Sequence, residues 1–131
     1  TPICVEVLVE ETETILLALA KDVSDAIYLV NGDERKKIHL AMLMAGTFTQ
    51  QLWNQAKELL ASIELEPQLI QGVVENYMKS FFSNHPISPA QEAAKLQDGR
   101  MVMDQQSLID RPEMQEIYKQ MLALIKSQSL D

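Results

Sequence analysis

The feature that most constrains the fold is a long helical pattern in the first half of the chain. No proline occurs between Glu34 and about Ile63, and apolar residues recur every three, four or seven positions. These residues are Ile38, Ala41, Ala45, Phe48, Leu52, Ala56, Leu59 and Ile63. The pattern predicts one helix, roughly 45 Å long if it is unbroken, with Asp33 as its N-cap.

The middle of this helix, Leu40 to Gly46, is apolar on all sides. A helix without a polar face is normally buried on every side, so we expect it to be the central helix of the fold. Gly46 allows either a close helix crossing or a kink. A chain of 131 residues has few internal elements to cover such a helix. We therefore expect a symmetric homodimer that buries it, because two-fold dimers are the commonest oligomers.

Residues 1–32 have the pattern strand, helix, strand. Strand-forming residues run from Ile3 to Val9, a helical pattern with an acidic first turn covers Glu10 to Asp22, and Ile27 to Val30 is a second strand. This order predicts two parallel strands joined by a crossover helix. Two strands alone make a poor sheet. We expect them to extend a sheet that lies outside this chain or that a partner chain supplies.

The second half of the chain contains shorter helical patterns separated by proline and glycine. Ser88 is a good N-cap, Pro89 suits the first helical position, and Gln91 closes a capping box. The helix that they start is expected to end near Asp98-Gly99. Further helices are expected after Pro67, from Met103 to Ile109 and from Pro112 onward.

Together these patterns predict a mainly α fold. Residues 1–32 form a short N-terminal βαβ segment, and residues 33–131 form a helical bundle around the long central helix. The length and the 47% hydrophobic content are those of one domain. We therefore expect residues 1–131 to form a single domain.

Charge and composition exclude several classes of function. The net charge of −8 disfavours nucleic-acid binding, since the basic cluster Arg35-Lys36-Lys37 has no aromatic residue among it and suits a solvated helix face. The longest apolar run is far shorter than the ~20 residues of a membrane span, and no signal peptide is evident. Cys4 is the only cysteine, and its apolar neighbours favour a buried, inert thiol. We expect a reducing, cytoplasmic setting.

Catalytic motifs are mostly missing from the sequence. It has neither a glycine-rich phosphate loop nor a G-x-S-x-G elbow, and neither histidine has the spacing of a metal ligand. His39, beside the apolar part of the long helix, suits a core-edge histidine bonded to a backbone carbonyl. Alternatively, it is a proton donor or substrate contact in a cleft, because imidazoles titrate near neutral pH. His85 suits an exposed loop.

Several segments resemble one known family. They are Thr1-Pro2-Ile3-Cys4-Val5-Glu6, Arg35-Lys36-Lys37-Ile38-His39-Leu40-Ala41, Phe48-Thr49, Ser88-Pro89-Ala90-Gln91, and Asp110-Arg111-Pro112-Glu113-Met114-Gln115-Glu116-Ile117-Tyr118. The chain resembles the C-terminal helical domain, of unknown function, of Rossmann-like NADP oxidoreductases. These are distant relatives of pyrroline-5-carboxylate reductase and of deazaflavin-dependent NADP reductases. The resemblance covers nearly the whole chain and keeps the order of its elements.

The resemblance implies a fold like the C-terminal domain of 6-phosphogluconate dehydrogenase. It also implies that an upstream Rossmann domain binds NADP, that the two strands complete the sheet of that domain, and that the helices form the dimer and wall a substrate cleft. By this resemblance the chain itself holds no cofactor or metal and is not catalytic alone. His39 matches the histidine of the family's R-K-x-H-x-A segment, which implies a catalytic role for it.

Two departures from the family pattern leave a second hypothesis open. This chain has Thr47 where the family has asparagine, and Glu92 to Gln97 lacks the family's Gly-Pro turn and its arginine. Arginine is the residue best suited to hold a carboxylate or phosphate at two points, and Gln97 cannot replace its charge. The alternative is a non-catalytic interaction or dimerisation module that has lost the active-site residues of the family.

Overall fold

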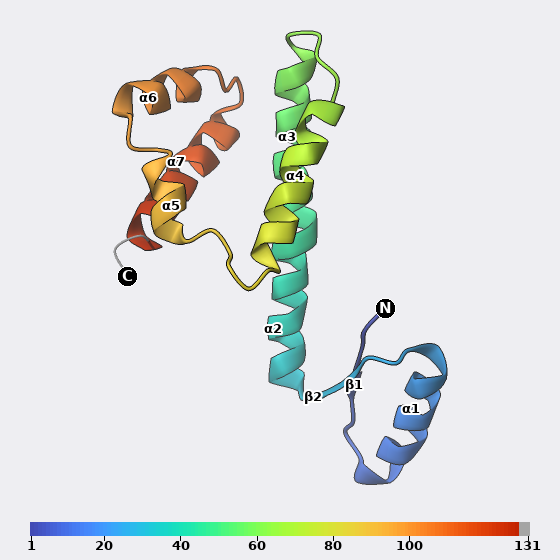
Figure 1. Ribbon diagram of the computed structural model, residues 1–131. Coiled ribbons are helices and arrows are strands. Elements are labelled where there is room, and N and C mark those ends of the chain that lie inside the picture. The colour runs from blue at the N-terminus through green and yellow to red at the C-terminus, as the bar shows by residue number, and fades with distance from the viewer. Residues whose placement is uncertain (129–131) are drawn as a thin grey trace. The chain divides into compact units, whose positions relative to one another are not determined.

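The computed structural model describes residues 1–128. The chain forms two compact units, the first Thr1–Pro67 and the second beginning at Gln68. The described residues are mainly helical, with one short parallel sheet at the N-terminus, as the sequence predicts (Figure 1). The single domain and the bundle around the long helix stay predictions.

The sheet consists of β1 (Ile3–Glu6) and β2 (Ile27–Val30), joined by α1 (Glu10–Val23). The strands are parallel, in a register that runs from Ile3 opposite Ile27 to Glu6 opposite Val30. β1 ends at Glu6 rather than at the predicted Val9, because β2 offers no pairing partner beyond Val30. Apolar side chains past Glu6 therefore belong to the loop that leads into α1.

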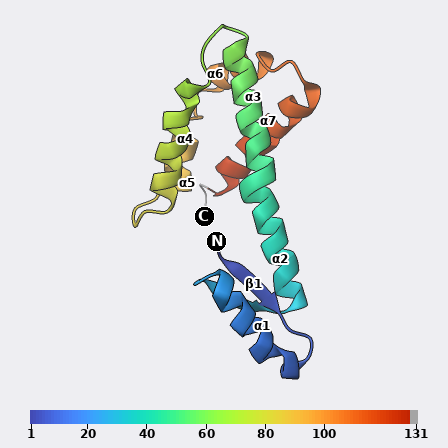
Figure 2. The ribbon, with the colours of Figure 1, turned by 90° about the vertical axis from the view of Figure 1, so that its right-hand side faces the viewer.

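α1 covers one face of this sheet and leaves the other face open. Val5 and Ala20 are the buried hydrophobic residues among those described, with 9% and 8% exposure. Figure 2 shows α1 lying along β1. Successive side chains of a strand point to opposite faces, so Cys4 and its pairing partner Tyr28 lie on the uncovered face and are exposed. The prediction of a buried Cys4 thiol is therefore wrong for this chain.

The long helix is present, but its middle is not α-helical. It consists of α2 (Gly32–Met42), a π-helix η1 (Leu43–Phe48), and α3 (Thr49–Ala61). These three segments follow one another as one continuous rod in Figures 1 and 2. A π-helix has i→i+5 hydrogen bonds and is wider than an α-helix. Gly46 lies inside η1, and a Cβ atom there would meet nothing within 4 Å.

The N-cap of the long helix is Asn31 and not the predicted Asp33. Asn31 Oδ1 accepts from the backbone N–H of Glu34, and Glu34 Oε2 accepts from the backbone N–H of Asn31, both at 2.9 Å. This reciprocal capping box satisfies two backbone donors at once. Asp33 instead lies inside the first turn, where an acidic side chain favours the helix dipole.

The apolar middle of the helix is exposed in the single chain, and its predicted burial by a second copy stays a prediction. Met42 is 65% exposed and Met44 59% exposed. The sheet contacts the helix near its N-terminal end, where Arg35 Nε lies 2.7 Å from Glu6 Oε2. The sheet thus anchors the start of the helix, and the apolar stretch further along remains uncovered.

The second unit contains α4 (Gln68–Phe81), α5 (Pro89–Ala94), α6 (Gly99–Ser107) and α7 (Pro112–Gln128). The predicted capping box of α5 is confirmed, since Ser88 and Gln91 exchange hydrogen bonds of 2.8 and 3.2 Å. Asp98 does not end α5 but begins α6, because its Oδ1 accepts from the backbone N–H groups of Arg100 and Met101.

Candidate functional site

His39 lies on the last turn of α2, just before the π-helix. Its side chain is exposed, and its imidazole has no hydrogen-bond partner among residues 1–128. The interpretation of His39 as a core-edge residue bonded to a carbonyl is therefore wrong for this chain. The backbone carbonyl of His39 accepts from the N–H of Leu43 and so links α2 to η1.

The π-helix brings a hydroxyl to the same side of the rod as His39. In an α-helix, a residue lies about 40° further around the axis than the residue four positions before it. In a π-helix, residues four positions apart lie roughly one above the other, because four residues make about one turn. His39, Leu43 and Thr47 therefore lie nearly on one line along the helix. Both polar members of this line are exposed. Single π-turns inside α-helices are frequent at functional sites.

The π-helix has its own internal support. Thr49 Oγ1 donates a hydrogen bond of 2.7 Å to the backbone carbonyl of Met44, five residues earlier. This bond satisfies a carbonyl where the regular α-helical ladder is interrupted. The hydroxyl of Thr49 is thus committed to the backbone, unlike that of Thr47, for which the described part of the chain offers no hydrogen-bond partner.

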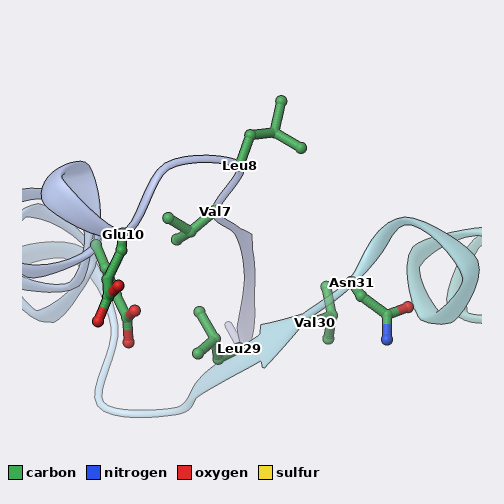
Figure 3. Close-up of a pocket in the computed structure, with 7 residues that line it drawn as sticks. Val7, Leu8, Glu10, Leu29, Val30 and Asn31 are labelled. Carbon is green, nitrogen blue, oxygen red and sulfur yellow. The ribbon is translucent and has the colours of Figure 1, made fainter.

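A separate cavity of about 360 Å³ lies at the carboxyl ends of the two strands. Its lining residues are Val7, Leu8, Glu10, Glu13, Leu29, Val30 and Asn31. In Figure 3, Val7 and Leu8 come from the loop after β1, Leu29 to Asn31 from the end of β2, and Glu10 from the start of α1. Ligands of open α/β sheets bind at this edge. His39 does not line the cavity.

The chemistry of this cavity does not fit a dinucleotide. Its charged groups are the carboxylates of Glu10 and Glu13, and no cation lines it. The carboxylates of Glu10 and Glu13 repel a diphosphate. The cavity offers apolar walls and hydrogen-bond acceptors, which suit a neutral or cationic group.

A family model described as a domain of unknown function, DUF2520, matches residues 1–125. The chain belongs to the DUF2520 family. No curated protein matches it.

The DUF2520 chain has the fold of one half of a larger protein. It is similar to a crystal structure of a "putative NADP oxidoreductase" from Bacteroides fragilis, with a TM-score of 0.76 and 22% identity. The match covers 98% of this chain and 49% of that one, so the chain spans about half the length of that protein. Family and fold together confirm the resemblance to the C-terminal helical domain of such oxidoreductases.

The DUF2520 chain has a second polar cluster, which the sequence did not reveal. Lys95 Nζ donates to Tyr77 Oη at 2.8 Å and to Glu92 Oε1 at 2.9 Å. The ammonium also lies 5.1 Å from the centre of the Tyr77 ring. The hydrogen bond to Tyr77, and then the bond to Glu92, raise the pKa of Lys95 above its ordinary value. These hydrogen bonds connect α5 to α4, and the positive charge of Lys95 is paired with Glu92.

Only the Glu92–Lys95 half of this cluster has a signal in the sequence, the i, i+3 spacing of opposite charges. His85 is exposed in the loop before α5, as predicted.

Across residues 1–128, no group of three or more His, Cys, Asp or Glu side chains is arranged to hold a metal ion. None of the described helices combines the length and apolarity of a membrane span.

Proposed function

We propose that this chain is the C-terminal helical domain of a cytoplasmic NADP-dependent oxidoreductase, in which it joins two copies and walls a substrate cleft. The fold match carries the proposal, because nearly all of this chain corresponds to half of a protein named for NADP oxidoreduction. The open sheet face and the uncovered middle of the long helix support it. Both are surfaces that a second domain or a second copy would cover.

The NADP site is assigned to a Rossmann domain outside this chain. The two parallel strands would add to its sheet, since parallel sheets are stable when they have several strands and helices on both faces. The carboxylates at the strand ends argue against the dinucleotide binding here. Titrating this chain with NADPH tests the assignment: binding at micromolar concentration would contradict it.

His39 is the proposed catalytic residue, acting as proton donor or as contact to the substrate. Its exposed, unpartnered imidazole supports this role, and a proton delivered to a carbonyl or imine is the complement of hydride transfer from NADPH. Thr47, on the same line of the helix, offers a hydroxyl to the same substrate.

The decisive experiment measures NADPH oxidation by the full-length protein with ketone and imine substrates. We expect His39→Ala to lower kcat/KM by about 10²-fold or more, which is typical for loss of a general acid. His85→Ala is the matched control, because it removes the other histidine, which is exposed in a loop of the second unit. Equal rates for both variants and the unaltered protein would remove His39 from the mechanism.

The alternative is a non-catalytic module that keeps the dimer and has lost the chemistry. The segment Glu92 to Gln97 favours it, because the one cation there, Lys95, is paired with Glu92 and Tyr77 rather than free to hold a substrate anion. Under this alternative, the full-length protein binds NADPH weakly or not at all. It then turns over none of these substrates but remains a dimer in light scattering.

A further inference from the structure

We propose that Glu6 is a positioning residue for His39, because its ion pair with Arg35 fixes the direction in which the long helix leaves the sheet. The inference rests on the proposed role of His39 and adds a residue that does not itself touch the substrate. The observations that carry it all lie within the first unit, where the ends of β1 and β2 meet the first turns of α2.

The long helix starts directly at the end of the sheet. Val30 is the last residue of β2, Asn31 is the helix N-cap, and Gly32 is the first helical residue (Figure 3). This connection of one residue holds the start of α2 at a single point. Rotation about the backbone bonds of that residue would still change the direction of the helix, so a second point of attachment is needed to fix it.

Glu6 supplies this second point from the neighbouring strand. It is the last residue of β1 and lies opposite Val30 in the sheet. Its Oε2 lies 2.7 Å from Nε of Arg35 on α2, and its side chain is only 24% exposed. A contact with a guanidinium has a defined geometry, because the guanidinium is planar and rigid. The start of the helix is therefore held at two points by two neighbouring strands.

The carboxylate of Glu6 also lies close against the first residue of the helix. A Cβ atom on Gly32 would lie 3.2 Å from Oε1 of Glu6, which is closer than ordinary van der Waals contact. One carboxylate oxygen therefore faces Arg35, and the other occupies the space that the glycine leaves. The positive end of the helix dipole favours a carboxylate at this place.

The direction of the helix matters relative to the sheet. In the proposed function, the two strands join the sheet of the domain that binds NADP, and ligands of such sheets bind at the carboxyl ends of the strands. His39 therefore has to be held in a fixed place relative to these strand ends. Glu6 is itself at one of them, and so it links the strand end to the helix that carries the imidazole.

His39 lies one turn beyond Arg35 on the same side of the helix, because residues four apart are neighbours on an α-helix. From Asn31 to His39 the helix rises about 12 Å. A change of about 10° in the direction of the helix would therefore move His39 by about 2 Å. A misplacement of about 1 Å can lower the rate of a catalysed step by about 10²-fold. Loss of the Glu6 contact should thus slow proton transfer.

A double-mutant cycle tests this role in NADPH oxidation by the full-length protein. We expect Glu6→Gln to lower kcat by about tenfold and to leave the KM for NADPH within about twofold. In a His39→Ala background, Glu6→Gln should lower the rate no further, because Glu6 acts through His39. A purely structural contribution would lower the rate by the same factor in both backgrounds. Glu11→Gln is the matched control, since it removes the same charge from an exposed position of the same unit.

A second variant and a measurement without turnover complete the test. Arg35→Met breaks the same ion pair from its more exposed side, where the side chain is 65% exposed, and should lower kcat equally. Residual dipolar couplings report the orientation of the α2 amides relative to the amides of β1 and β2. Glu6→Gln should reduce the couplings of α2 relative to those of the sheet, while circular dichroism shows an unchanged helix content.

The outcomes separate this inference from the proposed function. If Glu6→Gln and Arg35→Met keep the full rate while His39→Ala loses it, Glu6 has no positioning role and the proposed function stands. Equal losses from Glu6→Gln with and without His39, or unchanged couplings in α2, overturn the inference in the same way. If His39→Ala has no effect on the rate, the role of His39 and this inference both fail.

Discussion

Replacing Asn31 by alanine removes the cap that starts the long helix at the end of the sheet. In the native chain, the backbone N–H of Glu34 donates to Asn31 Oδ1, and the backbone N–H of Asn31 donates to Glu34 Oε2. The substitution removes Asn31 Oδ1, the acceptor for the Glu34 amide, and weakens the bond from the Asn31 amide to Glu34 Oε2. The backbone bond from Arg35 N to the Asn31 carbonyl remains available, so the effect is confined to the first turn.

The magnitude follows from the two bonds. Loss of an Asn N-cap typically costs about 1 kcal/mol, and weakening an exposed charge-assisted bond adds about 0.5 kcal/mol. Together the first turn loses about 1.5 kcal/mol, which is close to a tenfold change in its opening equilibrium. By comparison, Asp33 contributes only through the helix dipole. An exposed acidic residue in a first turn is worth about 0.3–1 kcal/mol.

Native-state hydrogen exchange measures this loss at the affected amide. We expect the Glu34 amide to exchange about tenfold faster in Asn31→Ala, because that amide has lost its acceptor. Asp33→Ala is the control for a change of charge in the same turn, and we expect it to alter this rate by less than about fivefold. Glu34→Gln should keep most of the protection, since glutamine also closes a capping box.

The reasoning fails if the two alanine variants behave alike. Equal acceleration at Glu34 in Asn31→Ala and Asp33→Ala would mean that the dipole and not the capping box holds the first turn. An unchanged rate in Asn31→Ala would mean that the helix does not begin at this residue in solution.

Two further predictions concern other hydrogen bonds. Thr49→Val should remove the side-chain bond to the exposed Met44 carbonyl and destabilise the π-helix by about 1 kcal/mol. The loss should appear as faster amide exchange within the π-helix, whereas Thr49→Ser should retain the bond. Tyr77→Phe should lower the pKa of Lys95, measured by NMR at its Cε. Because the pKa of Lys95 is raised in the folded state, the stability that its charge contributes is fully present below the unfolded pKa of about 10.4. This contribution is lost as pH rises through the folded pKa.

Local signals in the sequence predict the elements whose boundaries are set by their own residues. The strand Ile27–Val30 and the capping box at Ser88 match the structure, because strand propensity and cap chemistry are local. The end of β1 is not local, since it depends on where β2 stops. The long helix is capped by Asn31 rather than by the predicted Asp33, because both residues suit an N-cap and only the pairing with Glu34 decides between them.

The sequence singles out His39 as a candidate site residue, but it does not reveal which side chains lie near it. Spacings of three and four residues indicate an unbroken α-helix, and nothing in them reveals the π-turn that aligns His39 with Thr47. The exposure of His39 depends on how many elements surround the helix, which periodicity does not report. Lys95 and Tyr77 are 18 residues apart, and only the packing of α5 on α4 brings them together.

The π-turn also decides which side chains share the side of His39. Residues four apart drift around an α-helix by about 40° per step, so in a regular α-helix Thr47 would lie about 80° away from His39. Within η1, four residues complete roughly one turn, so Thr47 stays near the line of His39. The sequence therefore shows a histidine and a hydroxyl eight residues apart, and only the π-turn brings the two side chains to one side of the helix.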